Sequence, residues 1–534
     1  MRTLKHTYRQ ILLILLVITL LCPGSAWAYG SALAEVRDLL RNYYVEPVKE
    51  DVLNSPTIDA ILSQLDDPYT IFMTPEQYQD FNNSLEQNFT GIGIYLDIVE
   101  EGVKVTALIS GSPAEKAGLQ VGDILTFIDG RSLKGLFPEE LIPLIRGPEG
   151  SMMQLLVQRS GTSFAVQVQR ENITIPSVTS EIKAFNTGYL SISSFASETS
   201  KLFTDSLDNL HRQNPNAYIV DLRDNGGGYA GAALDIAGFF IGDNVAMQTK
   251  YRDTPPYLDR AVKHSYIIDK PTIYLLNENS ASASEVLAGA VRDYGKAVLI
   301  GTQSYGKGCM QELINLDSGD YLKMTVADLR SPLGNDINKK GITPDLLIEK
   351  ADPLKAAELL LSASDTEKNI NGLVKLTLAS KSFVIDTEKA REPEYWQAYG
   401  EIIDRVGMGL MKGKDNGWES VPALELTDRR SLYYPDYQLG NQLPSVPVDK
   451  KFTLTFSRNV NWQTVNHSNI ELIASDGERI PLNLNPLNST QIQASPEKNL
   501  VPNTCYWLLL HPGIQYTDES SMPTGIVFTA TVNP

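Results

Sequence analysis

The stretch Ala217-Tyr218-Ile219-Val220-Asp221-Leu222-Arg223-Asp224-Asn225-Gly226-Gly227-Gly228 decides the fold of the central part of this chain. It begins as an apolar run, which is typical of a strand buried on both faces of a sheet, and it ends in a glycine-rich turn. Residues 272–276 form a second apolar run, and helical patterns alternate with the strands at 199–212, 230–240 and 284–294. The alternation predicts a layered α/β domain over about residues 173–350, with its chemistry where strands end.

Length and composition limit the possible classes of protein. At 534 residues the chain exceeds one hydrophobic core, so about three or more domains are expected. An apolar fraction of 42% and a charged fraction of 21% are ordinary for soluble globular protein, which argues against a disordered chain or a polytopic membrane protein. The 64 acidic and 46 basic side chains give a net charge of -18, which would repel a phosphate backbone. Nucleic acid is therefore not expected as a partner.

Residues 1–28 have the pattern of an export signal. Basic side chains within the first ten residues precede an apolar run at 11–22, and small residues lie just before position 28. We therefore expect export to the extracellular space or the cell envelope, with cleavage after Ala28. An uncleaved membrane anchor is the alternative, although the run is short against the roughly 20 residues that span a bilayer.

Residues 31–87 are predicted to form an N-terminal helical region. Apolar residues recur there at spacings of three and four, beginning with Leu33, Val36, Leu40 and Tyr43. Residues at these spacings share one face of a helix, so we expect them to pack against the rest of the protein.

The C-terminal part of the chain shows two further patterns. Residues 363–440 are expected to be a linker or a region of unknown role, with a helix near 395–406. Residues 441–534 alternate short strands with turn residues. This second region resembles the bacterial Ig-like domains, so a C-terminal β-sandwich is expected there.

Residues 88–172 combine short strands and two brief helices in a fixed order. Strands are expected at 92–98, 103–108 and 124–128, and helices at 112–119 and 139–145. This order resembles a PDZ domain. The resemblance implies that the backbone amides of Gly91, Ile92, Gly93 and Ile94 receive the terminal carboxylate of a peptide, which adds to the sheet as a strand. A small β-rich domain whose Gly-x-Gly is only a turn is the alternative.

The segment Asn279-Ser280-Ala281-Ser282-Ala283-Ser284-Glu285 carries the first candidate for chemistry and precedes an apolar helix. It fits a capping box, in which Ser282 bonds an early backbone amide and Glu285 reaches back. The same helix start suits a nucleophile, because its free amides and positive dipole stabilise the oxyanion of a tetrahedral intermediate. From this segment alone, a structural cap and a catalytic serine are equally compatible.

The segment Tyr305-Gly306-Lys307-Gly308-Cys309-Met310-Gln311 supplies a candidate base. Glycines on both sides of Lys307 allow an unusual backbone path that turns the side chain inward, where desolvation lowers the pKa of the amine. A neutral amine could then deprotonate Ser282. Gln311 could orient the amine or a bound carbonyl. The plain alternatives are a solvated loop lysine and an ordinary strand glutamine.

Together these motifs are similar to those of the carboxy-terminal processing peptidases, also called tail-specific proteases. The similarity extends over residues 31 to about 362 and rests on the segments 221–228, 280–285, 305–308, Gln311 and Gly341-Ile342-Thr343-Pro344-Asp345. It implies a multidomain α/β protein whose core, at 173–362, is a crotonase/ClpP-like α/β serine protease.

The resemblance implies that Ser282 is the nucleophile, Lys307 the general base and Gln311 the support of the lysine. We therefore predict an exported serine endopeptidase that engages protein or peptide substrates by exposed C-terminal tails and cleaves them with a Ser-Lys dyad. One alternative is a catalytically inactive secreted PDZ adaptor. Another is an envelope-tethering protein in which the Ig-like tail matters most.

Further roles are implied for residues around the dyad. The oxyanion hole of the family joins the amide of Ala283 to that of Gly228 or Gly227. Gly226 departs from the pattern, since many members carry proline there, but no amide donor is lost by the change. Arg146 matches an arginine that in some members links the PDZ domain to the active site.

No other catalytic or metal-binding pattern is evident in the sequence. None of the five histidines lies in a glycine-rich or strand-end motif beside an acid, so nothing suggests a Ser-His-Asp triad. Histidine and cysteine spacings fit no zinc site, and no calcium loop occurs. Beyond the signal only Cys309 and Cys505 remain, which predicts no disulfide framework. No cofactor is expected.

Overall fold

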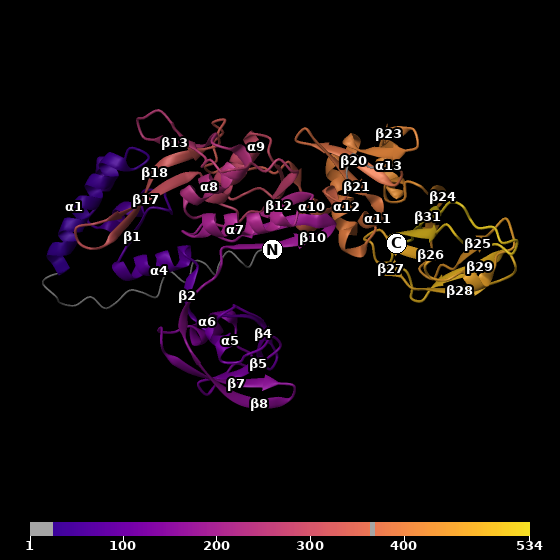
Figure 1. Cartoon of the computed structure of the whole chain (residues 1–534), viewed down its shortest axis with the longest axis horizontal. Helices are drawn as coiled ribbons and strands as arrows, with labels where there is room; N and C mark the ends of the chain where they lie inside the picture. The colour runs from indigo at the N-terminus through magenta and orange to yellow at the C-terminus, as the bar shows by residue number, and fades with distance from the viewer. Residues whose placement is uncertain (1–24, 364–368) are drawn as a thin grey trace. The chain divides into compact units, whose positions relative to one another are not determined.

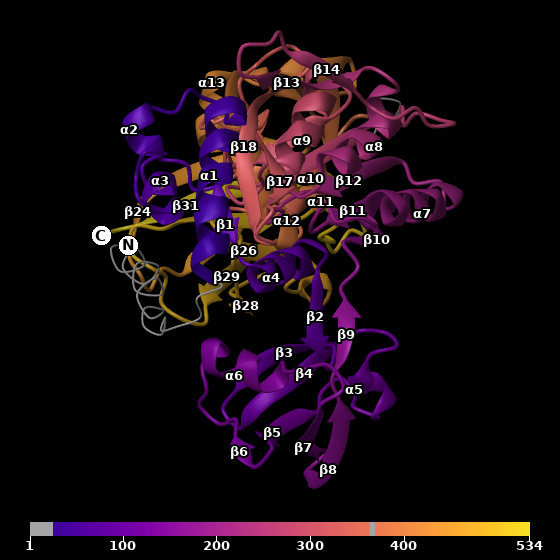
Figure 2. The same ribbon diagram turned by 90° about the vertical axis from the view of Figure 1, so that its left-hand side faces the viewer.

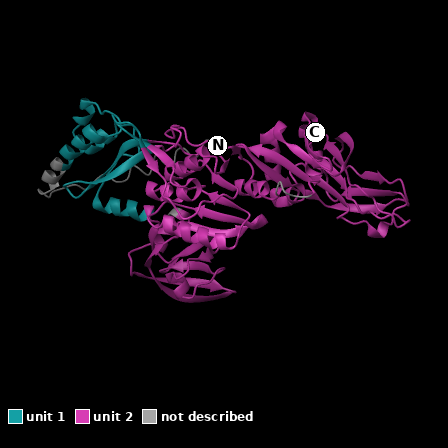
Figure 3. Ribbon diagram, turned by 45° about the horizontal axis from the view of Figure 1, so that its top comes forward, with its two compact units in different colours: residues 1–84, 249–257, 309–328 teal, residues 85–248, 258–308, 329–534 magenta. Residues whose placement is uncertain are grey.

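The computed structural model describes residues 25–363 and 369–534. The chain divides into two compact units, coloured separately in Figure 3. Within the described residues, the first unit contains those up to 84 together with 249–257 and 309–328, and the second contains the remainder.

Most of the predicted signal segment, residues 1–24, lies outside the described residues. The first helix, α1 (Ser25–Tyr43), includes the expected cleavage position at Ala28. None of the helices in the described part of the chain is long and apolar enough to cross a membrane.

The first unit packs helices against an antiparallel hairpin. Its elements are α1, α2 (Glu50–Leu53), α3 (Ile58–Leu62), β1 (Ile71–Met73), α4 (Pro75–Leu85), β17 (Cys309–Asn315) and most of β18 (Tyr321–Arg330). Helix α1 buries Ala32, Val36 and Leu40, which belong to one core cluster with apolar residues of the hairpin. The prediction that Tyr43 lies on this face is wrong. Tyr43 is 63% exposed, and Tyr44 is buried because it continues the four-residue repeat.

The second unit contains a six-stranded sheet within the region that the sequence predicted to be α/β (Figure 1). Its strands, in spatial order, are β10 (Val178–Lys183), β11 (Thr187–Ile192), β12 (Ala217–Asp221), β15 (Thr272–Leu276), β16 (Val298–Gly301) and β19 (Leu346–Leu347). Only the β10–β11 pair is antiparallel. Every residue of β12 and β15 is buried, as expected for parallel strands covered on both faces. The carboxyl ends of these two strands therefore lie side by side.

Helices alternate with these strands along the chain, which confirms the predicted α/β pattern. They are α7 (Thr199–Arg212), α8 (Ala230–Ile241), α9 (Ala283–Asp293) and α10 (Pro353–Leu360). Two further strands, β13 (Val245–Tyr251) and β14 (Tyr257–Arg260), occur where the sequence passes from one unit to the other.

The residues predicted to resemble a PDZ domain form a sheet with two flanking helices (Figure 2). The sheet order is β3 (Ile94–Val99), β4 (Gly102–Leu108), β5 (Ile124–Ile128), β7 (Met152–Arg159) and β8 (Thr162–Gln169), with the short β6 (Arg131–Ser132) beside β5. The helices are α5 (Pro113–Lys116), capped by the Ser112 side chain, and α6 (Pro138–Ile145). Strands β2 (Asn88–Gly91) and β9 (Glu171–Thr174) pair where the chain enters and leaves this domain.

The region to which the sequence assigned no role is folded. Its sheet has the order β21 (Lys381–Asp386), β20 (Leu373–Leu378), β22 (Met411–Lys414) and β23 (Gly417–Ser420). Its helices are α11 (Thr387–Ala390), α12 (Pro393–Val406), α13 (Ala423–Asp428) and α14 (Arg430–Tyr433), of which α12 confirms the helix expected near 395–406. Apolar residues of this region share one core cluster with β12, β15 and α10.

The C-terminal residues 438–534, which we call the two-sheet domain, form two sheets around one core. The larger sheet has the order β24 (Gln438–Val446), β31 (Ile526–Val532), β30 (Cys505–Leu510), β26 (Ile470–Ala474) and β27 (Arg479–Ile480). The smaller has the order β25 (Phe452–Thr455), β29 (Gln491–Pro496) and β28 (Leu482–Pro486). The strands expected from the alternating pattern are therefore present, while an Ig-like assignment stays a prediction.

Candidate active site

Ser282 lies in the turn between β15 and α9, at the residue before the helix begins. Its φ of 57° and ψ of -114° are rarely adopted by residues other than glycine, and such a backbone costs on the order of 1–3 kcal/mol. A sharp, strained turn from strand to helix is one way to present a serine hydroxyl above a sheet. The neighbouring serines hold the turn, because the hydroxyl of Ser280 donates to Leu222 O at 2.8 Å and that of Ser284 to Asn225 O at 2.9 Å.

The carboxylate of Glu285 joins this turn to the loop that contains Lys307. The side chain is 0% exposed. Its Oε2 accepts the amide of Ser282 at 2.9 Å and the amide of Lys307 at 2.8 Å. Its Oε1 accepts the hydroxyl of Ser304 and the amide of Gly306, the latter at 2.7 Å. Two segments that are distant in sequence are therefore held within hydrogen-bond reach of one carboxylate.

The charge state of Glu285 reflects two opposing effects. Burial raises the pKa of this carboxyl, because removing it from water penalises the ionised form. The hydrogen bonds from Ser304 and from three backbone amides favour the ionised form and offset part of that rise.

Glycine is required on each side of Lys307, at Gly306 and Gly308, for a different structural reason. Gly306 has a φ of 90°, which favours glycine. Gly308 packs so tightly that a Cβ there would lie 2.1 Å from the amide nitrogen of Asn338. The amide of Lys339 also donates to Gly306 O at 2.8 Å. The backbone on both sides of Lys307 is thus fixed by close contacts, and Lys307 itself is half-buried.

The segment beginning Gly341-Ile342 holds this loop from the other side. The amide of Ile342 donates to Ser304 Oγ at 2.6 Å, and the amide of Ser304 donates to Ile342 O at 3.2 Å. Gly341 has a φ of 69°, and a Cβ there would lie 2.5 Å from Ser304 O. Because Ser304 also donates to Glu285, this segment supports the carboxylate that links Ser282 and Lys307.

The glycine turn after β12 lies against the candidate nucleophile. A Cβ on Gly227 would come within 2.7 Å of Ser282 Cβ and 3.1 Å of the Ala283 amide nitrogen. The amide of Gly227 already donates to Asn225 Oδ1 at 2.9 Å. Ala283 begins α9, where backbone amides lack partners within the helix. Of the two glycines predicted for the oxyanion hole, Gly228 is therefore the better partner for Ala283.

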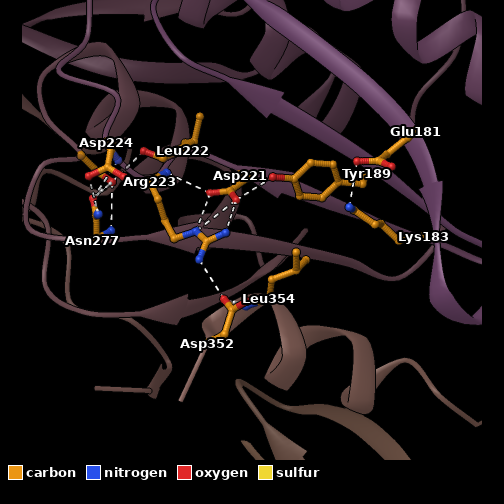
Figure 4. Close-up of polar contacts among 11 residues, drawn as sticks. Glu181, Lys183, Tyr189, Asp221, Leu222, Arg223, Asp224, Asn277, Asp352 and Leu354 are labelled. Carbon is orange, nitrogen blue, oxygen red and sulfur yellow. Dashed lines mark hydrogen bonds and ion pairs between the residues drawn. The ribbon is translucent and has the colours of Figure 1, made fainter. Parts of the chain in front are cut away.

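Side-chain hydrogen bonds connect the loops after β12 and β15 (Figure 4). Asp224 Oδ1 accepts the side-chain amides of Asn279 at 2.7 Å and Asn277 at 2.9 Å. The amide of Asp224 donates to Asn277 Oδ1 at 2.9 Å. The side-chain bond from Asn279, followed by that from Asn277, lowers the pKa of the Asp224 carboxyl. The glycine turn and the Ser282 turn are therefore tied together by this carboxylate.

An ion pair anchors the beginning of the glycine turn (Figure 4). Arg223 Nη2 lies 2.6 Å from Asp221 Oδ2, and Nη1 lies 3.0 Å from Asp352 Oδ1. The hydroxyl of Tyr189 donates to Asp221 Oδ2 at 2.8 Å. Burial, together with the charge of Asp221, raises the pKa of Tyr189 to about 12, so the phenol remains a donor at neutral pH.

Gln311 belongs to the first unit, whereas Ser282 and Lys307 belong to the second. It lies in β17 at a register shift in the pairing with β18. Its Nε2 donates to Cys309 O at 3.1 Å and contacts Cys309 Sγ at 3.2 Å. Support of Lys307 by Gln311 stays a prediction.

The residues predicted to bind a peptide carboxylate occupy the start of the PDZ-like sheet. Gly91 ends β2, Ile92 is fully buried in the domain core, and Ile94 begins β3, an edge strand. Gly93 has a φ of 75°, and a Cβ there would lie 2.4 Å from Ser112 Cβ. Edge strands have backbone groups available for pairing with an added strand.

Arg146 lies directly after α6. Its guanidinium carbon is 5.6 Å from the centroid of the Phe89 ring, in β2. The arginine therefore contacts the strand through which the chain enters the PDZ-like domain. A link to the catalytic residues stays a prediction.

Histidine, cysteine and acidic side chains elsewhere are the other groups that could serve in catalysis or bind a metal. Among the described residues, no group of three or more histidine, cysteine, aspartate or glutamate side chains is suited to holding a metal ion. His264 stacks on Phe239 with ring centroids 3.6 Å apart, and His511 lies between Tyr437 and Glu471. Neither Cys309 nor Cys505 takes part in a disulfide among the described residues.

Comparison with known proteins identifies the family. Residues 186–348 match Peptidase family S41, and residues 104–159 match a PDZ domain. The carboxy-terminal processing protease CtpA of Bacillus subtilis is 33% identical over 347 residues, which are 64% of this chain and 74% of that protein. The chain belongs to peptidase family S41.

A second relative of this S41 peptidase agrees with the assignment. A probable CtpA-like serine protease of Staphylococcus aureus is 32% identical over 362 residues, or 67% of this chain and 73% of that protein. Among solved structures, the photosystem II D1 C-terminal processing protease is 26% identical, with coverage of 62% of this chain and 97% of that chain and a TM-score of 0.41. The predicted relationship to the C-terminal processing proteases and the predicted PDZ domain are confirmed.

The sequence predicted the contact of Glu285 with the Ser282 turn but not its contacts with the Lys307 loop. The capping-box pattern predicted its bond to the Ser282 amide, and that bond is present. The bonds to Gly306 and Lys307 had no local signal, because those residues follow a later strand.

We predict opposite outcomes for alanine at two neighbouring glycines. No described atom lies within 4 Å of a Cβ at Gly226, so Gly226→Ala should keep activity and raise the free energy of unfolding by about 0.4–1 kcal/mol, since alanine restricts the unfolded chain. Gly227→Ala should abolish cleavage, because Gly227 has a φ of 103° and a Cβ there would lie 2.7 Å from Ser282 Cβ. Urea unfolding and casein cleavage measure both effects. Full activity of Gly227→Ala would contradict the geometry.

We predict that Glu285→Gln reduces both stability and turnover. An amide group would place an NH2 donor against a backbone N–H that now donates to Glu285, at a cost of about 1–3 kcal/mol. Glu401→Gln is the matched control, since Glu401 accepts the amides of Glu349 and Ala351 and none from a catalytic segment. Both variants should unfold at lower urea concentration, and only Glu285→Gln should lose kcat. An unchanged kcat in Glu285→Gln would reject the linking role.

Proposed function

We propose that this S41 peptidase is an exported endopeptidase that binds the C-terminal tails of protein substrates through its PDZ domain and cleaves them with a Ser282–Lys307 dyad. The observation that carries the proposal is the pair of hydrogen bonds from the Ser282 and Lys307 amides to one oxygen of Glu285. A serine in a strained turn, and a half-buried lysine whose backbone amide shares a Glu285 oxygen with the amide of that serine, support nucleophilic catalysis with a lysine base.

In the proposed reaction, Ser282 Oγ attacks the carbonyl carbon of the scissile bond while neutral Lys307 Nζ accepts the hydroxyl proton. The amides of Gly228 and Ala283 donate to the oxyanion of the tetrahedral intermediate. Lys307 then gives its proton to the leaving amine as the peptide bond breaks. Water, deprotonated by Lys307, attacks the carbonyl carbon of the acyl-enzyme, and as the ester bond breaks Lys307 returns the proton to Ser282 Oγ. The role of Gln311 as support of the lysine is assigned from the family resemblance.

Substrate selection is assigned to the PDZ domain. The backbone amides at Gly91, Ile92, Gly93 and Ile94 would bind the terminal carboxylate, and the tail would add to the edge strand β3. Phe137 and Ile142, on or beside α6, are 70% and 44% exposed and offer apolar contacts to such a tail. Arg146 would relay occupancy of this groove through its contact with Phe89.

The finer assignments of location and fold are part of the proposal. The pattern of residues 1–28 supports export to the cell surface or envelope, with an uncleaved anchor as the alternative to cleavage after Ala28. The parallel sheet with its nucleophile turn supports a crotonase/ClpP-like core, and the two sheets with a shared core support an Ig-like C-terminal domain.

The leading alternative is a secreted PDZ adaptor with an inactive hydrolase core. All three candidate catalytic side chains are present in the sequence, which disfavours it. Incubation with an unfolded protein distinguishes the two, because an adaptor binds without producing fragments.

We predict that Ser282→Ala and Lys307→Ala each abolish cleavage of an unfolded protein. Loss of a capping serine should cost only about 1 kcal/mol. Both residues donate to Glu285 through backbone amides, which alanine keeps, so both variants should remain folded. Lys340→Ala is the matched control, since Lys340 is an exposed lysine paired with Asp336 and should keep full turnover. Covalent labelling by a serine-reactive probe, mapped by mass spectrometry, should modify Ser282 in the parent protein. Turnover retained by Ser282→Ala would reject the assignment.

We predict that a substrate with a free C-terminal carboxylate binds more tightly than the same peptide with a C-terminal amide. Amidation removes the charged acceptor for the backbone amides, which should weaken binding by about tenfold or more. Fluorescence anisotropy with the Ser282→Ala variant measures binding without cleavage. Equal affinities for the two peptides would remove the PDZ domain from tail recognition.

A further inference from the structure

The two-sheet domain is open along one side. A cavity of about 720 Å³ lies between β25 of the smaller sheet and β24, β31 and β30 of the larger sheet. This volume is in the range of ligand-binding clefts. Its apolar lining is formed chiefly by Phe452, Leu454, Phe456, Leu508, Phe528 and Ala530.

The opening follows from the unequal widths of the two sheets. The smaller sheet has three strands and ends at β25, whereas the larger has five and continues to β31 and β24. The inward side chains of β25, which include Phe452 and Leu454, are buried. On β24, Leu443 lines the cavity and is 38% exposed. The cavity therefore lies where a further strand beside β25 would complete the smaller sheet.

The free edge of β25 has backbone groups available for such a strand. The amide of Phe456 donates to Thr490 O at 2.9 Å, on the side of β29. Because amide directions alternate along a strand, the amides of Thr453 and Thr455 point to the opposite, open side. Strand β25 contains no proline and no charged residue, which are features that commonly protect a sheet edge.

The charges around the cavity favour a particular kind of segment. Among the described residues no acidic side chain lines it, although the chain as a whole has a net charge of -18. The charged lining residues are Lys450 and Lys451, directly before β25. A bound segment would therefore pair best with acidic side chains at one end and apolar side chains along its length.

We propose that this cavity, with the free edge of β25, binds an extended segment of another polypeptide by strand addition. The segment pairs with the amides of Thr453 and Thr455, places alternate apolar side chains against Phe528 and its neighbours, and pairs acidic residues with Lys450 and Lys451. Residues 450–457 all line the cavity, so the site has the elongated form of a strand rather than that of a compact ligand. The inference does not depend on the proposed function.

The test uses the full chain carrying Ser282→Ala and a fluorescent peptide of about ten residues, the upper length of a typical strand. The peptide alternates valine and threonine, begins with two aspartates and ends in an amide, so that neither cleavage nor carboxylate recognition contributes. Thr453→Pro should weaken binding by about tenfold or more, because it removes an outward amide and blocks approach of a strand. Thr453→Val, which keeps the amide, should bind like the parent.

A charge-reversed variant provides a second test that does not alter β25. The double substitution Lys450→Glu and Lys451→Glu should weaken binding by about tenfold and strengthen binding of a matched peptide that begins with two lysines. Thermal unfolding verifies that each variant is folded. Absence of binding by the parent, or equal binding by Thr453→Pro and Thr453→Val, would overturn the inference. Dimerisation of the full chain that Thr453→Pro abolishes would assign the edge to a second copy and would also overturn it.

Discussion

A single buried carboxylate, that of Glu285, determines the arrangement of the candidate active site. Four donors from two separate parts of the chain converge on its two oxygens. A carboxylate suits this position because both of its oxygens accept hydrogen bonds, whereas an amide would present a donor at one of them. Its position at the start of α9 also places a negative charge at the positive end of that helix. The residue that caps the helix is therefore also the residue that brings the Lys307 loop to Ser282.

The strained turn at Ser282 is stable because many contacts surround it. Ser280 and Ser284 donate to carbonyls of the loop after β12, and Asp224 bonds asparagines of the loop after β15. Parallel pairing of β12 with β15 is what makes these bonds possible, since the carboxyl ends of adjacent parallel strands meet at one edge of the sheet. The cost of the unusual backbone conformation is offset by several ordinary hydrogen bonds. The strained backbone conformation is that of Ser282, whose hydroxyl must be accessible for reaction.

Structural features that depend on local sequence patterns could be predicted from the sequence. Apolar runs identified β12 and β15, the Ser112 motif identified α5, and the capping-box pattern identified the bond between Glu285 and the Ser282 amide. The sequence could not predict contacts that arise only after strands assemble, such as the bond of Lys307 to Glu285. It also failed where two helical registers fit the same pattern, since Tyr43 and Tyr44 are adjacent and only packing distinguishes them. The sequence also could not distinguish Gly227 from Gly228 as the oxyanion-hole glycine, because either one satisfies the motif. The structure shows that the Gly227 amide already donates to Asn225.

The residues after 362 contribute side chains to the hydrophobic core of the second unit. Ile219 and Ile273, from the two strands that lead to the glycine turn and to Ser282, belong to the same core cluster as Trp396 and Tyr433. Trp507 of the two-sheet domain also belongs to that cluster, and its ring lies 5.5 Å from that of Trp396. Tightly packed interiors transmit changes in side-chain volume to their neighbours. The strands that position the candidate catalytic loops are thus packed, on one side, against residues that lie outside the segment matched to the peptidase family.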